Sequence, residues 1–231
     1  MKISHRFVII TAVFITCLIT ANIIAVKVIA VRVINIDLIL PAAIIIFPIS
    51  YIFGDILTEV YGYHWARRVI WLGFACNLLF VIFARIGQTL PPAPFWGGQE
   101  AYKTILGYTP RLLVASFIGY LAGEFANSFV LARMKILTRG RWLWSRTIGS
   151  TIVGQGLDTS IFITLAYIGT PSFVLIMILY HWLAKVLFEA IFTPFTYAVV
   201  NYLKKKEATD TYDYKTNFNP FLISDKKRQK P

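Results

Sequence analysis

The sequence predicts an all-α integral membrane protein with six transmembrane helices and both termini in the cytoplasm. Composition is the first observation: 57% of the 231 residues are hydrophobic, 15% are charged, and the mean hydropathy is +0.65. A soluble domain carries about a quarter of charged residues. We therefore take the bilayer as the solvent of most of the chain, and we exclude soluble enzymes and disordered proteins.

The second observation is a set of six stretches that approach the length of about 20 apolar residues needed to cross a bilayer. Residues 1–203 are interpreted as one transmembrane domain, and the polar residues 204–231 predict a disordered cytoplasmic tail. The six stretches are residues 7–26, 39–57, 69–86, 112–134, 148–168 and 173–203.

The third observation is the distribution of Lys and Arg, which are enriched on the cytoplasmic side of membrane proteins. Most of them lie in the N-terminus, the second and fourth loops and the tail. The other side holds Lys27, Arg32, Arg85, Lys103 and Arg111. This asymmetry agrees with an even number of spans, and it explains the net charge of +12 without a nucleic-acid partner.

The first span contains Asn22, whose amide either links helices or binds a ligand. We expect the span to be retained rather than cleaved as a signal peptide, because its apolar run is long and no clear cleavage site follows. Residues 28–38 come next. Their β-branched side chains partly alternate, which predicts a short hairpin or an interfacial segment.

The second span contains Asp55 and Glu59, which share a helix face because they are four residues apart. An ionisable group inside a span costs about 2.5–3.5 kcal/mol on insertion scales, so it pairs, faces water or has a function. Arg67, Arg68 or Lys185 are candidate cations for these two carboxylates. We expect Asp55 to bind a ligand and Glu59 to lie among the lipid head groups.

Two aromatic residues are candidates for stacking on a flat ligand. Tyr51 lies one turn before Asp55, and Trp71 lies in the third span. Their alternative roles are core packing and the interfacial belt. The outer segment at residues 88–107, rich in proline and glycine, then predicts a rigid loop.

The fourth span carries Glu124 and Asn127, which project the same way because they are three residues apart. Gly119 and Gly123 form a small-xxx-small pair that lets another helix approach closely. A carboxylate beside an amide provides an acceptor and a donor for a polar ligand. The alternative is structural pairing between helices.

The fifth span contains Gln155 between Gly154 and Gly156, followed by Asp158. Each glycine weakens a helix by about 1 kcal/mol relative to alanine. We therefore expect a loosened helix at this depth, as in transporters whose helices are interrupted around a cavity.

The sixth span has a polar stripe of His181, Lys185 and Glu189 at intervals of four residues. Lys185 either pairs with Glu189 along the helix or serves as the counter-ion of a carboxylate on another span. These two arrangements remain open at the level of sequence.

Several motifs of catalytic sites are absent from the sequence. It contains no Walker A loop, no zinc-protease motif and no nucleophile elbow. The three histidines and two cysteines show no metal-ligand spacing. We expect no enzymatic activity, no cofactor and no metal.

Three segments and one residue resemble the bacterial queuosine precursor transporter family: FPISYIFGDILTEVYG at 47–62, ARR at 66–68, GQGLDT at 154–159, and Lys185. The resemblance covers residues 7–203. It implies an importer in the bacterial inner membrane, similar in fold to the substrate-binding subunits of energy-coupling-factor transporters. The implied substrates are 7-cyano-7-deazaguanine and 7-aminomethyl-7-deazaguanine, which are precursors for tRNA modification.

A 7-deazaguanine is flat and presents two N–H donor groups beside one carbonyl acceptor. Glu124 or Asp158 is expected to accept both donors, and amides or Lys185 to donate to the carbonyl. An aromatic side chain would stack on the ring. The expected substrate-binding residues are Asn22, Tyr51, Asp55, Trp71, Glu124, Asn127, Gln155, Asp158 and Lys185.

The preferred mechanism is alternating access around a buried polar site, with the energy source left open. The runner-up is a binding subunit that needs a separate ATP-driven partner, for which the small residues Ala21 and Ala25 offer a docking face. A membrane enzyme acting on a lipid or prenyl substrate and a purely structural protein are further alternatives. A homo-oligomer is compatible with each of these.

Overall fold

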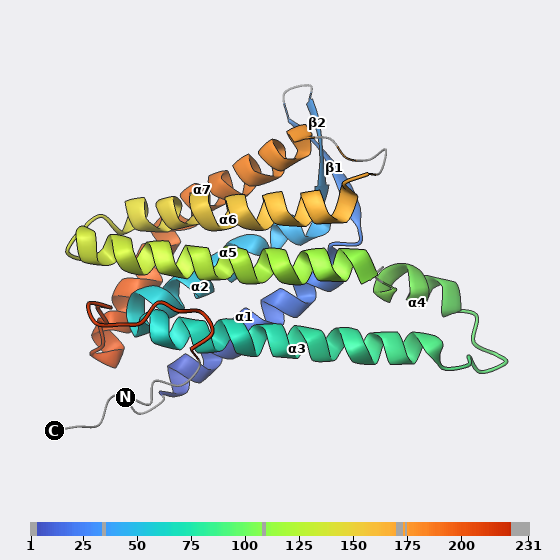
Figure 1. The fold of residues 1–231 in the computed structure, drawn as a ribbon, viewed down its shortest axis with the longest axis horizontal. Helices are drawn as coiled ribbons and strands as arrows, with labels where there is room; N and C mark the ends of the chain where they lie inside the picture. The colour runs from blue at the N-terminus through green and yellow to red at the C-terminus, as the bar shows by residue number, and fades with distance from the viewer. Residues whose placement is uncertain (1–3, 34–35, 108–109, 170–172, 174, 223–231) are drawn as a thin grey trace.

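The computed structural model describes residues 4–33, 36–107, 110–169, 173 and 175–222, and these form long helices and one hairpin (Figure 1). The helices are α1 (His5–Ile24), α2 (Phe47–Tyr61), α3 (Tyr63–Thr89), α4 (Gln99–Leu106), α5 (Pro110–Leu137), α6 (Leu143–Tyr167) and α7 (Leu175–Glu207). The strands are β1 (Val28–Val33) and β2 (Ile36–Pro41), and a 3-10 turn (Ala42–Ile45) leads into α2.

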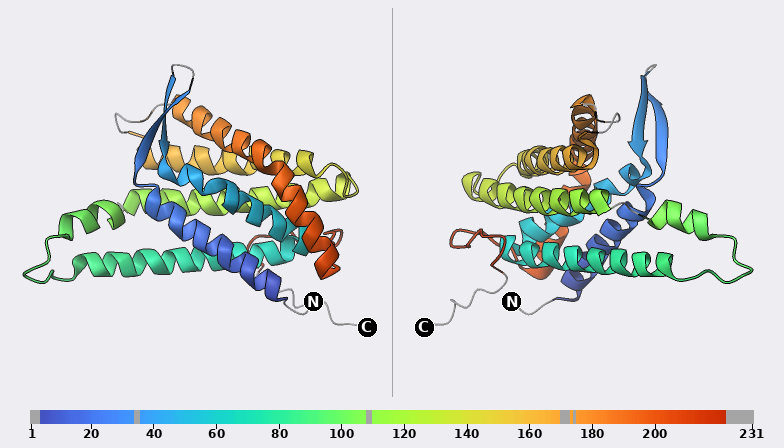
Figure 2. Two further views of the ribbon diagram at one scale, coloured as in Figure 1. Left: turned by 180° about the vertical axis from the view of Figure 1, so that it is seen from behind. Right: turned by 45° about the vertical axis from the view of Figure 1, so that its right-hand side comes forward.

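Helix α2 is the centre of the bundle. It packs against α1, α3, α5 and α7, and its residues are buried from Ser50 to its end except for Phe53. Helices α5 and α6 lie side by side along their length (Figure 1). Helix α7 contains Pro194, which removes one helical hydrogen bond and permits the change of direction seen in Figure 2.

Four helical segments are long and apolar enough to cross a membrane: α1, α3, the segment at 99–137 that includes α5, and α7. Large apolar side chains cover the outside of the bundle, among them Leu79 and Phe83 on α3 and Leu187 and Ile191 on α7. These surfaces suit contact with lipid tails. Helix α2 has 15 residues and α6 is more polar, so six crossings remain a prediction.

The second predicted span starts too early. Residues 39–41 belong to strand β2, and the helix begins only at Phe47, with Pro48 in its first turn. The predicted hairpin at 28–38 is confirmed, since β1 and β2 pair antiparallel with Arg32 opposite Asp37. The loop predicted at 88–107 contains helix α4.

The tail differs from the disordered segment expected from residue 204. Helix α7 continues to Glu207, and residues 208–222 fold back over the ends of α2 and α3. Asp213 accepts from the backbone N–H of Tyr63 at 3.0 Å, and the fully buried Arg67 donates to the carbonyls of Asn217 and Asn219. Residues 223–231 lie outside the described residues.

Candidate functional site

The side chains of α2 meet polar groups from two other helices inside the bundle. Asn127 of α5 donates to Asp55 Oδ1 at 2.9 Å, and the Tyr51 hydroxyl donates to Gln155 Oε1 of α6 at 3.2 Å. All four side chains are buried. These hydrogen bonds connect residues that lie 72 and 104 positions apart in the chain.

An ion pair joins α6 to α7 in the same region. Lys185 Nζ donates to Asp158 Oδ2 at 2.6 Å and to Thr159 Oγ1 at 3.1 Å, and it lies 5.3 Å from the centre of the Phe47 ring on α2. Of the two arrangements left open by the sequence, the structure forms the pair between helices. Glu189 is not the partner of Lys185.

Glu124 of α5 lies beside Gly54 of α2. Its Oε2 lies 3.6 Å from the position that a Cβ atom on Gly54 would occupy. Among the described residues it has no hydrogen-bond partner, and it is partly exposed rather than sealed. The charges of Asp158 and Lys185 are near enough to act on it. The Glu124 carboxylate is therefore accessible and can accept hydrogen bonds from a ligand.

These residues form one site, which we call the polar cluster. Four helices contribute to it, and the arrangement offers carboxylates, amides, a hydroxyl and an ammonium inside an apolar bundle. Its members are Tyr51, Asp55, Glu124, Asn127, Gln155, Asp158 and Lys185.

Glycines bring α5 and α6 close enough to form the cluster. A Cβ on Gly123 would lie 2.7 Å from Asp158 Cβ, and one on Gly154 would lie 2.7 Å from Asn127 Cβ. The close approach predicted at Gly119 and Gly123 is confirmed. The expected loosening around Gln155 is wrong, because α6 is continuous from Leu143 to Tyr167 and Gly154 serves helix packing instead.

Glu59 lies in a second ionic group rather than among lipid head groups, and its side chain is fully buried. Arg146 Nη2 donates to Glu59 Oε1 at 2.8 Å, and Lys204 Nζ does so at 2.6 Å. Lys135 donates to the Glu59 carbonyl and to Asp210, both at 2.5 Å. We call these five residues the Glu59 cluster.

The predicted cations for Glu59 were Arg67, Arg68 and Lys185, so this part of the prediction is wrong. Lys135, Arg146 and Lys204 appear in the sequence only as positive charges between or after spans. Their convergence follows from the packing of α2, α5, α6 and α7, which no local spacing reveals.

Two predicted binding residues lie outside the polar cluster. Asn22 donates to Asn77 Oδ1 at 2.9 Å and so links α1 to α3. Trp71 donates to the Pro220 carbonyl at 2.8 Å and packs against Phe221 of the tail. The structure thus gives Asn22 a linking contact and Trp71 a contact with the tail.

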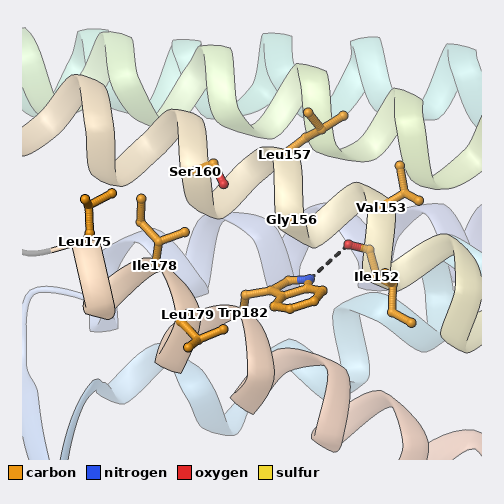
Figure 3. Close-up of a pocket in the computed structure, with 9 residues that line it drawn as sticks. All are labelled: Ile152, Val153, Gly156, Leu157, Ser160, Leu175, Ile178, Leu179 and Trp182. Carbon is orange, nitrogen blue, oxygen red and sulfur yellow. Dashed lines mark hydrogen bonds between the residues drawn. The ribbon is translucent and has the colours of Figure 1, made fainter.

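An open groove of about 550 Å³ runs between α6 and α7 (Figure 3). Trp182 lies in it and donates to the Ile152 carbonyl at 2.9 Å. Its lining is almost entirely apolar and includes neither Asp158 nor Lys185. The groove therefore offers lipid-like contacts and none of the polar groups of the cluster.

Comparison with known proteins identifies the family. The family model described as "Putative vitamin uptake transporter" matches residues 41–199, which include the whole polar cluster. The chain belongs to this family. Its members are named as transporters, and with the apolar helices this makes the chain a multi-pass membrane protein.

Two curated relatives carry more specific names within the same function. The chain is 34% identical over 157 residues to the "Probable queuosine precursor transporter" of Bacillus subtilis (strain 168), covering 66% of this chain and 68% of the relative. It is 26% identical over 171 residues to the "Queuosine precursor transporter" of Escherichia coli (strain K12), covering 70% and 73%. No solved structure matches the chain.

Proposed function

We propose that the protein imports 7-deazaguanine precursors of queuosine across the bacterial inner membrane, by alternating access around the polar cluster. The names of the two relatives support the substrate class. The observation that carries the proposal is the Glu124 carboxylate, which has no hydrogen-bond partner within the described ranges and lies beside the Asp158–Lys185 pair inside an apolar bundle. Six crossings with cytoplasmic termini are part of this proposal.

The chemistry of the cluster suits a guanine-like edge. Glu124 would accept the ring N–H and the 2-amino group together, and an ionised carboxylate makes stronger hydrogen bonds than a neutral acceptor. Lys185 or the amide of Gln155 would donate to the substrate carbonyl. Tyr51 and Phe47 stack on each other with ring centres 5.8 Å apart, and they would provide the flat surface for the ring.

The test is rescue of tRNA modification in cells that cannot make the precursor and lack their own importer. We expect supplied precursor to restore queuosine in tRNA when this gene is present. Glu124→Gln should lower initial uptake at least tenfold, because losing one charge-assisted bidentate contact costs about 1.5–3 kcal/mol. Glu100→Gln, on the exposed face of α4, is the matched control and should take up substrate normally.

Uptake by the purified protein in liposomes without ATP separates a carrier from the runner-up, a binding subunit driven by a separate ATPase. A protein that binds 7-cyano-7-deazaguanine but transports it only with an added ATP-driven module would support the binding subunit. Failure of both binding and transport would reject the substrate class.

A further inference from the structure

Two buried carboxyl groups, one on α2 and one on α7, have oxygens without a hydrogen-bond partner in the part of the chain that the structure describes. Glu189 is 0% exposed, and neither of its carboxylate oxygens has a partner among the residues that the structure describes. Asp55 Oδ2 is unpartnered within the same described part, although Oδ1 accepts from Asn127. Buried polar atoms nearly always find a partner. Three such oxygens lie on two helices that pack against each other, and an unpaired buried carboxyl group is more stable protonated than as a bare carboxylate.

The surroundings of the two carboxyl groups are acidic. Glu189, Glu124 and Glu59 all lie near enough to repel a negative charge on Asp55. Lys185, one turn from Glu189 along α7, donates to Asp158 instead. Tyr51 and Glu59 on α2 and Glu124 on α5 lie near the two carboxyl groups. On α7, Lys185 lies one turn and His181 two turns before Glu189, and Asp158 of α6 is the ion-pair partner of Lys185.

We infer that Asp55 and Glu189 share one proton, and that this proton is the coupling ion of transport. The inference rests on the proposed function and adds its energy source. Two bare carboxylates in a medium of low dielectric constant are strongly disfavoured, whereas a protonated carboxyl can donate to the other carboxylate. A proton also requires no cavity, which agrees with the complete burial of Glu189.

The step moves one proton and no electrons. On the outer side, a carboxylate oxygen of the pair takes a proton from water and forms an O–H bond. The hydroxide that remains is protonated by the external buffer. The same O–H bond breaks on the cytoplasmic side and returns the proton to water. Pro194, five residues after Glu189, gives α7 a place to bend as the contact with α2 opens.

The experiment uses the full chain in liposomes with radiolabelled 7-cyano-7-deazaguanine and the membrane potential clamped at zero. With one proton per neutral substrate, an acidic exterior should raise accumulation about tenfold per unit of pH difference. Uptake that ignores the pH gradient overturns the inference but leaves the proposed function standing. Absence of any uptake rejects the proposed function itself.

Variants then assign the proton to Glu189. In Glu189→Gln, uptake with the pH gradient should equal uptake without it. In Glu100→Gln, the gradient should stimulate uptake as in the unmodified protein. An unchanged ratio in Glu189→Gln overturns the assignment. If Glu189→Gln shows no uptake, Glu189→Asp is measured in its place. Uptake that responds to the pH gradient supports the proton site, and a variant without uptake or without a response to the gradient overturns it.

Discussion

The pair of Asp158 and Lys185 shows how much a single contact contributes when one partner is partly exposed. Removing one member of a fully buried pair costs about 3–5 kcal/mol, while an exposed pair contributes about 0.2–1 kcal/mol. The Asp158 side chain is 26% exposed and that of Lys185 is 10% exposed. We therefore expect an intermediate coupling energy of about 1–3 kcal/mol between the two residues.

A double-mutant cycle measures this coupling. Lys185→Met leaves Asp158 without its cation, and Asp158→Asn leaves Lys185 without its anion, so each should lower the thermal midpoint of unfolding in detergent. The double variant should lose less stability than the two single variants together, because no lone charge remains. Strictly additive losses would show that the pair contributes nothing beyond its separate residues.

Asp210, in the tail outside the spans, gives the Glu59 cluster a dependence on pH. Although burial favours its neutral form, hydrogen bonds from Lys135 and Lys204 hold the pKa of Asp210 below its usual value. A carboxyl whose pKa is lowered by folding stabilises the protein above its unfolded-state pKa. This contribution is lost as the pH falls through the lowered pKa.

Thermal unfolding of Asp210→Asn across pH checks this sign. Near neutral pH the variant should be less stable than the unmodified protein by up to about 1 kcal/mol, since the Asp210 side chain is 42% exposed. The two curves should converge in acid, below the usual range of an aspartate. A difference that grows as the pH falls would contradict the ion-pair assignment.

At the scale of elements, the contact between α5 and α6 depends on glycines. Gly154→Ala would place a methyl group 2.7 Å from Asn127 Cβ and 2.8 Å from the Gly123 carbonyl. The helices must separate, which costs about 1–3 kcal/mol as overpacking, and the polar cluster widens. We expect a lower thermal midpoint together with weaker uptake.

Gly97→Ala is the matched control for this substitution. No atom of a described residue lies within 4 Å of the position where its Cβ would be, so stability and uptake should remain unchanged. Equal behaviour of the two variants would show that α5 and α6 tolerate separation at Gly154.

Sequence predicted the helices well where a long apolar run coincides with one element. The third, fourth, fifth and sixth stretches each fall within or nearly within α3, α5, α6 and α7. The second stretch failed because hydropathy cannot distinguish the apolar strand β2 from a helix. Glycines around Gln155 were misread for a related reason: whether glycine loosens a helix or admits a neighbour depends on what packs against it.

At the scale of the whole molecule, sequence predicted most members of the polar cluster but few of their partners. Polar residues inside apolar spans are conspicuous, so Asp55, Glu124, Asp158 and Lys185 could be named from the sequence alone. Which carboxylate pairs with Lys185 depends on the relative rotation of α6 and α7. The tail was missed in part because Arg67 and Trp71 donate to its backbone carbonyls, which carry no sequence signal.

The folded tail connects the end of the chain to its first half, and it gives a final prediction. Truncation after Glu207 removes the carbonyl acceptors of Arg67 and the Asp213 carboxylate that caps α3 at Tyr63. Losing such charge-assisted contacts should cost about 2–4 kcal/mol, or roughly 5–15 °C in a chain of this size. The measurement is the thermal midpoint in detergent.

Truncation after Leu222 is the control, because it removes only residues 223–231 and keeps every described contact of residues 208–222. This variant should melt at a higher temperature than the truncation after Glu207, and Arg67→Met in the full chain should reproduce part of the loss. If truncation after Glu207 left the midpoint unchanged, residues 208–222 would lie on the bundle without stabilising it. Stability would then come from the helices alone, and the buried Arg67 would need acceptors other than the tail.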